Sequence, residues 1–304
     1  MYMMVRRVVV LATTAALSCG FRRAPRLLAG ERGASRTALK SGGEVAVYDE
    51  VFELCDLEAL DVASADASHR AFSRRGGVGT ILEAALDSFL TELGDESPFV
   101  EYWSRDVWKH IEAHADVDEA LAKETGALRF PDHGHVLGLS VGPEARGPTC
   151  VFSRDGASLT TAPAVPGRVV RFSGDLEHAV PRPHDVWARS FVRATPSTAA
   201  NRRSVVLFNT WREPPKDVPL EPDYALPFGE SPVKARPRGA WLPAPCGVAG
   251  EGAADVVLKV PRLGDAKRRN GAPRHFEATT TPGALAALEA EAAVHRVALA
   301  RSSS

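Results

Sequence analysis

Short apolar runs separated by glycine and proline dominate residues 99–211 and restrict what this chain can fold into. The clearest runs lie at residues 136–139, 150–152, 168–172 and 204–208. Runs of this length, bounded by turn residues, are typical of strands in β-sandwiches and barrels. The segment therefore predicts a sheet core rather than a helical bundle.

The preceding residues, 47–91, have a mostly helical pattern. Thr80 and Glu83 have the spacing of a capping box, in which each side chain bonds a free amide of the first turn. Apolar residues at helical spacing follow, and Gly94 is a natural stop: Ile81, Leu82, Ala85, Leu86, Phe89, Leu90 and Leu93. Helices followed by strands predict an α+β, mainly β fold with helices packed on one side of the sheets.

The first 40 residues have the composition of a targeting sequence and are excluded from the predicted fold. They carry eight Lys/Arg and one acid, Glu31, and an apolar run at residues 8–17 ends at the small residues 18–20. These are the parts of a signal peptide, and the basic stretch that begins at Phe21 is like a transit peptide. The combination resembles the two-part presequences of algae with complex plastids, which predicts plastid import. Secretion or the ER lumen is the alternative.

Composition bounds the partners of the mature chain. A net charge of −1 over 304 residues gives no indication of a nucleic-acid partner. No later apolar run approaches the ~20 residues that span a bilayer. We divide the chain into the presequence 1–40, a sheet domain 41–215, and a Pro/Gly/Ala-rich tail 216–304. In the tail, we expect a strand at 256–260 and a terminal helix at about 283–301.

Three potential metal ligands lie within the predicted strands. His114 and Asp116 form a His-x-Asp segment, and His178 follows 64 residues after His114. Side chains two apart on a strand point the same way, so one short segment can offer two ligands to one ion. Two imidazoles and one carboxylate on one face of an octahedral ion, with the other face open, are typical of non-haem Fe(II) oxygenases.

A basic segment opens the last run of the predicted sheet domain. Arg202 and Ser204 share one face of the expected strand, whereas we expect Arg203 to point away. A guanidinium matches a carboxylate bidentately, which suits it to the far end of a dicarboxylate.

Together these residues resemble the 2-oxoglutarate/Fe(II)-dependent dioxygenase superfamily, in its prolyl-hydroxylase-like lineage, from about residue 100 to residue 211. The resemblance implies a double-stranded β-helix, or jelly roll, in which iron is bound by His114, Asp116 and His178. It implies that Arg202 and Ser204 bind the cosubstrate 2-oxoglutarate, and Tyr102 is a further candidate for hydrogen bonding to it. The implied reaction consumes dioxygen, releases succinate and CO2, and hydroxylates a small molecule or a protein side chain.

Several alternatives remain at this point. The 24 residues from His178 to Arg202 exceed the spacing common in the family, so Arg203 competes with Arg202, and the loop 182–201 is a lid or an insertion. A jelly-roll metal-binding or scaffold protein without turnover is a second hypothesis. A cupin-like metalloenzyme that uses His133 or His135 is a third.

Overall fold

The computed structural model describes residues 44–65, 67–108, 111–142, 145–180, 202–221, 233–241, 254–256, 277–280 and 294–300, all within one unit, Ser35–Ser304. The predicted presequence 1–40 and the loop 182–201 lie outside these residues, so plastid import stays a prediction. Among the helices that the structure describes, none is long and apolar enough to cross a membrane.

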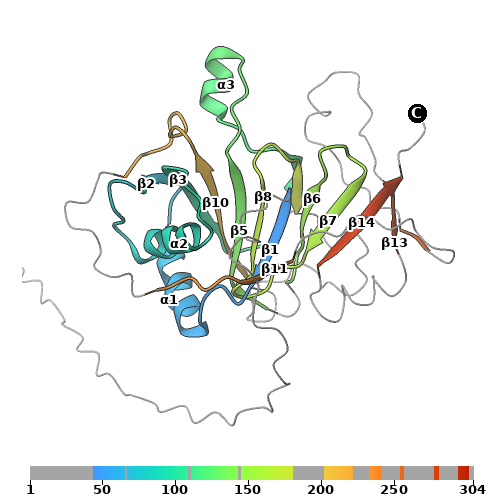
Figure 1. Ribbon diagram of the computed structural model, residues 1–304, viewed down its shortest axis with the longest axis horizontal. Coiled ribbons are helices and arrows are strands. Elements are labelled where there is room, and N and C mark those ends of the chain that lie inside the picture. The colour runs from blue at the N-terminus through green and yellow to red at the C-terminus, as the bar shows by residue number, and fades with distance from the viewer. Residues whose placement is uncertain are drawn as a thin grey trace, which may run out of the picture. The chain divides into compact units, whose positions relative to one another are not determined.

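Two antiparallel sheets of seven strands each form the core (Figure 1). In the first sheet the order is β11-β1-β8-β5-β10-β3-β2. Its strands are β11 (Arg238–Trp241), β1 (Val45–Asp49), β8 (Val169–Ser173), β5 (His133–Val141), β10 (Arg203–Trp211), β3 (Phe99–Arg105) and β2 (Arg70–Ser73). In the second sheet the order is β12-β13-β14-β7-β6-β9-β4. Its strands are β12 (Ala254–Val256), β13 (Glu277–Thr280), β14 (His295–Ala300), β7 (Ser158–Ala162), β6 (Thr149–Phe152), β9 (His178–Val180) and β4 (Ile111–His114).

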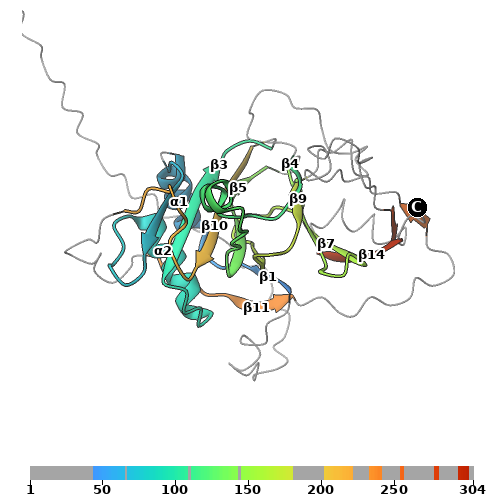
Figure 2. The same ribbon diagram turned by 90° about the horizontal axis from the view of Figure 1, so that it is seen from above.

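Helices α1 (Leu54–Ala65) and α2 (Ile81–Glu92) cover the face of the first sheet that points away from β4 and β9 (Figure 2). The predicted capping box begins α2, where the Glu83 amide donates to Thr80 Oγ1 at 3.1 Å and the Thr80 amide donates to Glu83 Oε2 at 3.2 Å. The prediction of a mostly helical segment 47–91 is wrong at β1 and β2. A short helix that the sequence did not indicate, α3 (Glu119–Thr125), begins at the N-cap Asp118 and ends at Gly126, whose φ is 74°.

Alternation along the strands divides the apolar residues of the first sheet between two cores. Val206 and Phe208 of β10 pack with the helices, together with Phe89 and Leu137. Val205, the residue before Val206, packs on the opposite face with β6 and β8, toward the second sheet. An α+β, mainly β fold is therefore confirmed, and the space between the two sheets is lined by the odd-numbered positions of β10.

The tail contributes strands to both sheets. β11 pairs with β1, and β14 pairs with β7, with Val297 opposite Leu159. The predicted terminal helix is therefore wrong at residues 295–300. Pairing with the edge of β7 satisfies the backbone groups of this segment, and intrinsic helix propensity alone does not outweigh that pairing. Of the predicted strand 256–260, only Val256 lies within described structure, at the end of β12.

Candidate metal centre

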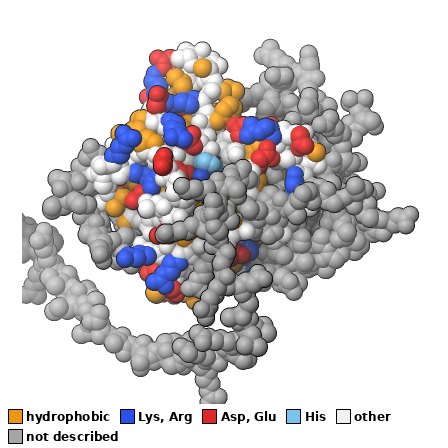
Figure 3. Space-filling view, in the orientation of Figure 1, with side chains coloured by type: hydrophobic (Ala, Val, Ile, Leu, Met, Phe, Trp, Pro, Cys, Tyr) orange, Lys and Arg blue, Asp and Glu red, His pale blue; other side chains and the backbone are white. Residues whose placement is uncertain are grey.

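A cavity of about 900 Å³ opens between the two sheets and is overhung by α3. Its walls come from β3 and β10 of the first sheet, from β4 and β9 of the second, and from residues 115–124 and 215–218. In Figure 3, acidic and basic side chains lie interspersed around α3 and the surface below it. The volume falls in the range of sites that enclose small organic ligands.

His114, Asp116 and His178 converge at one point of this cavity. Pairing of β4 with β9 places His114 opposite His178, with the two ring centroids 4.5 Å apart. Asp116 lies two residues after the end of β4, outside the strand. Its side chain is therefore directed into the cavity by the turn of the chain and not by the alternation of a strand. Its Oδ1 lies 3.4 Å from His114 Nε2, and its Oδ2 lies 3.8 Å from His178 Nε2. One ligand atom from each residue falls within 4.8 Å of the others.

The electrostatics of Asp116 and His178 match the protonation states that a metal needs. Burial would raise the pKa of Asp116, but hydrogen bonding to His114 and the proximity of His178 lower it to about 2. Burial lowers the pKa of His178 despite the nearby Asp116 carboxylate. An ionised carboxylate and neutral imidazoles are the states that bind divalent metals.

The spacing also fits a single ion. Two ligand atoms at right angles, each ~2.1 Å from a metal, lie ~3 Å apart. The observed separations of 3.4 and 3.8 Å close to that value with small side-chain rotations. His178 is held for this role, because its Nδ1 lies 3.3 Å from the Leu176 carbonyl oxygen and its Nε2 faces Asp116.

A buried network that the sequence analysis missed holds Asp116 from behind. Asn209 Nδ2 donates to Asp116 Oδ2 at 3.2 Å and lies 3.4 Å from Glu101 Oε2. The same Glu101 oxygen accepts from Trp211 Nε1 at 2.9 Å, and its other oxygen lies 2.6 Å from His69 Nε2. The sequence signal for Asn209 was the alternation of side chains along β10, since residues 203, 205, 207 and 209 all line the cavity.

The structure places Arg203, not Arg202, in the cavity. The Arg202 side chain is 44% exposed and pairs with Asp61 of α1 at 2.8 Å. Arg203 is buried, its Nε lies 3.3 Å from the Gly147 carbonyl oxygen, and its Nη2 has no partner within the described structure. β10 begins at Arg203, so alternation from Asn209 back along the strand points Arg203 inward. The expectation that Arg203 points away is wrong.

Burial, and then the nearby Arg105, lower the pKa of Arg203 to about 10, which leaves the guanidinium charged at neutral pH. A buried charge without a counter-ion is costly, so Arg203, which has none among the described residues, is a candidate for holding an anion.

Two other predicted cosubstrate contacts lie elsewhere. The Tyr102 hydroxyl donates to Glu83 Oε1 at 2.9 Å, within the core beneath α2. Tyr102 lies between Glu101 and Trp103 on β3, and alternation turns it to the helix side of the sheet. Ser204 is buried but is absent from the cavity lining.

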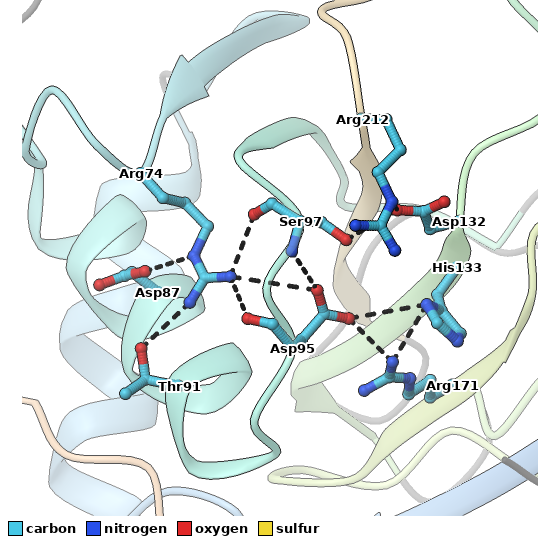
Figure 4. Close-up of polar contacts among 9 residues, drawn as sticks. All are labelled: Arg74, Asp87, Thr91, Asp95, Ser97, Asp132, His133, Arg171 and Arg212. Carbon is cyan, nitrogen blue, oxygen red and sulfur yellow. Dashed lines mark hydrogen bonds and ion pairs between the residues drawn. The ribbon is translucent and has the colours of Figure 1, made fainter. Parts of the chain in front are cut away.

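The histidines of the cupin alternative also lie outside the cavity. His135 is buried and stacks on Phe208, with centroids 4.3 Å apart, and its Nδ1 lies 3.1 Å from the Phe208 carbonyl oxygen. His133 accepts from Arg171 at 3.0 Å, and both approach the buried Asp95 (Figure 4). Across the described ranges, His114, Asp116 and His178 are the one group with metal-binding geometry.

Figure 4 shows that His133 belongs to a larger set of paired polar groups, which we call the Asp95 network. Its members are Arg74, Asp87, Thr91, Asp95, Ser97, Asp132, His133, Arg171 and Arg212. Arg171 donates to Asp95 Oδ2 at 2.8 Å, and the Ser97 amide donates to Asp95 Oδ1 at 2.9 Å. The network joins the end of α2 to β5, β8 and the end of β10.

No protein-family model and no curated protein matches the chain. Among solved structures, a prolyl-4-hydroxylase from Pseudomonas putida is 14% identical and matches 61% of this chain and 96% of its own, with a TM-score of 0.41. HygX from Streptomyces hygroscopicus, with nickel and 2-oxoglutarate bound, is 13% identical over 59% and 86%, with a TM-score of 0.36. A 2OG-Fe(II) oxygenase family oxidoreductase from Burkholderia pseudomallei is 16% identical over 64% and 98%, with a TM-score of 0.36.

Proposed function

We propose that the protein is an Fe(II)- and 2-oxoglutarate-dependent dioxygenase that hydroxylates its substrate. At the identities and TM-scores found, function is inferred from the site itself. The observation that carries the proposal is one cavity that holds a His-Asp-His group and, on the facing strand, a buried arginine without a counter-ion.

The strand order supports a double-stranded β-helix as the frame of this site. Strands β3 to β10 form four neighbouring strands in each sheet, in the orders β8-β5-β10-β3 and β7-β6-β9-β4. Successive strands mostly cross from one sheet to the other, as in a jelly roll. The ligand-bearing strands β4 and β9 are neighbours in one sheet, and β10 faces them from the other.

His114, Asp116 and His178 would bind the iron and leave the opposite coordination positions open for cosubstrate and dioxygen. When bound, iron with 2-oxoglutarate supplies the oxidising chemistry, with release of succinate and CO2. Asn209 fixes the Asp116 carboxylate, and the Leu176 carbonyl fixes the His178 ring, so the ligands are held before the metal arrives.

Arg203 would bind the distal carboxylate of 2-oxoglutarate. Its Nε is directed to the Gly147 carbonyl, and its Nη2, which has no partner among the described residues, is left for a charge-assisted contact with the carboxylate. An anion there satisfies Nη2 and neutralises the buried charge, and it fixes the orientation of the keto acid toward the metal ligands. The walls of Val136, Val180 and Val205 exclude water from this end of the cavity.

Dioxygen consumption and succinate formation test this proposal. The iron-loaded protein should consume oxygen and form succinate only when 2-oxoglutarate is present, slowly without a substrate and faster with one. A protein that binds iron and 2-oxoglutarate but never forms succinate would instead be the binding protein of the second hypothesis.

A further inference from the structure

One positive charge in the cavity has no role in the proposed function. Arg105, the last residue of β3, lines the same cavity as the metal ligands and Arg203. No hydrogen bond or ion pair joins it to any residue that the structure describes. It is only partly buried, whereas Arg203 is fully buried, so Arg105 lies nearer the open part of the cavity.

The two lysines of the cavity and Glu101 have partners of their own. Lys123 lies 3.5 Å from Glu119, and Lys216 pairs with Glu124. Both carboxylate oxygens of Glu101 accept hydrogen bonds, from His69 on one side and from Trp211 on the other. Arg105 and Arg203 are therefore the two lining cations left without a carboxylate partner in the described part of the chain.

Charge counting distinguishes these two arginines. The divalent metal, the Asp116 carboxylate, Arg203 and the two carboxylates of 2-oxoglutarate are together neutral. The guanidinium of Arg105 stands outside this set and has no carboxylate partner among the described residues, in a partly desolvated cavity. A charge in such a place is stabilised by an anion that arrives after metal and cosubstrate.

Apolar side chains surround Arg105 on the sheet floor. In the pairing of β3 with β10, Arg105 lies opposite Val205 and Trp103 lies opposite Leu207. All four line the cavity, and the Trp103 ring is supported edge-on by His69, with centroids 5.4 Å apart. The Arg105 guanidinium therefore borders an apolar surface that is formed by Trp103 of β3 and by Val205 and Leu207 of β10.

We infer that the substrate is an organic acid whose carboxylate or phosphate binds Arg105 and whose apolar body packs on Trp103, Val205 and Leu207. This inference rests on the proposed function, because the metal and the cosubstrate define which charge remains. The apolar body would then present its C–H bonds to the metal side of the cavity, while the acid group fixes its orientation.

Matched charged and uncharged probes test the inference by binding, without turnover. Protein loaded with Mn(II) and 2-oxoglutarate would be titrated with phenylacetate, its uncharged analogue phenylacetamide, and phenylphosphonate. Paramagnetic broadening of the ring-proton signals reports both affinity and proximity to the metal. The variant is Arg105→Gln, and the control is Arg202→Gln, which removes an exposed arginine outside the cavity.

We expect wild type to bind phenylacetate about tenfold or more tightly than phenylacetamide, since a charge-assisted hydrogen bond distinguishes them. The ratio should fall to about one in Arg105→Gln and stay unchanged in Arg202→Gln. Tighter binding of phenylphosphonate than of phenylacetate would identify a phosphate as the natural group, and the reverse a carboxylate.

Equal affinity of wild type for the acid and the amide would overturn the inference. So would an Arg105→Gln variant that loses tenfold or more affinity for 2-oxoglutarate itself, because Arg105 would then belong to the cosubstrate site. Failure of wild type to bind Mn(II) and 2-oxoglutarate at all would instead refute the proposed function, and this is measured before any probe is added.

Discussion

The Asp95 network and the polar groups of the cavity, His114, Asp116, His178 and Arg203, use the same kinds of side chain: histidine, aspartate and arginine. The two sets lie on opposite sides of the first sheet. In the network each ionised group finds a protein partner, with Asp95 between Arg171, His133 and the Ser97 amide. In the cavity, three ligand atoms face one another across 3.4 to 4.8 Å, and Arg203 has an unsatisfied nitrogen. The two regions hardly differ in composition, but Arg171 of the network is paired with Asp95, whereas Arg203 of the cavity keeps an unsatisfied nitrogen in the described structure.

This difference separates a structural cluster from a binding site. Asp95 is buried, which would raise its pKa, but bonds from Ser97 and the charge of Arg171 lower it below the ordinary value. Its partners are complete, so it requires no ligand. In the cavity, Asn209 positions Asp116, Leu176 positions His178 and Gly147 positions Arg203, whose Nη2 has no partner among the described residues. This is the state expected of a site organised to receive a metal and an anion.

The largest expected effect is loss of metal binding in His114→Ala. Removing one of three protein ligands should weaken Fe(II) binding roughly 1000-fold, above the 10–100-fold that loss of outer-shell partners costs. His135→Ala should keep metal affinity within about threefold of wild type, although it loses packing against Phe208. Isothermal titration under anaerobic conditions compares the two variants. Equal losses would mean that the histidine clusters are not distinct.

Asp95→Asn should destabilise the fold by about 3 kcal/mol, because it leaves Arg171 buried without its carboxylate partner. Denaturant unfolding of the metal-free protein measures this cost. Metal affinity of the folded variant should match that of wild type. A variant as stable as wild type would show that the network contributes little to the fold.

Arg203→Met should have the opposite profile. It removes a buried charge that has no counter-ion, so the metal-free protein should unfold at an equal or higher denaturant concentration. Affinity for 2-oxoglutarate should fall about 100-fold, since a charge-assisted contact is lost. Arg202→Met is the matched control and should retain the cosubstrate. Retention by Arg203→Met and loss by Arg202→Met would restore the original expectation for Arg202.

Asn209→Leu should weaken Fe(II) binding about tenfold, because Asp116 loses the donor that fixes its Oδ2. Asn209→Gln keeps the amide on a longer side chain and tests whether an amide at that distance can still fix Asp116. Spectra of the Co(II)-substituted protein should report altered carboxylate coordination in both variants. Unchanged spectra and affinity would show that the network behind Asp116 serves packing alone.

The smallest effect is a pH dependence of stability set by His133. Burial and then Arg171 lower its pKa to about 4 from the ordinary value of 6.5. Between these values the unfolded chain takes up a proton that the native state does not, so stability falls as the pH drops from about 6.5 toward 4. His133→Gln should flatten this part of the urea-unfolding profile. An unchanged profile would assign the pH dependence to other groups.

The strand-forming runs, the α2 capping box and the His114–Asp116 pair were predictable from the sequence, because each depends on local spacing. His178 lies 64 residues beyond His114 and was found through the resemblance to a family. The side that a strand presents was not predictable at Arg202 and Arg203, since it depends on where β10 starts against β5 and on a register shift after Ser204. A one-residue difference exchanges the two faces of a strand. Tyr102 was misassigned for the same reason.

Long-range pairing explains the remaining differences. Residues 295–300 pair with the edge of β7 and form β14. Glu101 and Asn209 come together because β3 pairs with β10, and no motif in the sequence joins them. That Arg203 Nη2 has no partner among the described residues is a property of the assembled cavity alone.

Anaerobic addition of Fe(II) and then 2-oxoglutarate to the wild-type protein tests the central claim most directly. We predict a weak visible charge-transfer band that appears only when both are present, that is absent in His114→Ala, and that needs a higher 2-oxoglutarate concentration in Arg203→Met. A wild-type protein that binds neither iron nor 2-oxoglutarate, or a band that His114→Ala retains in full, would contradict the account.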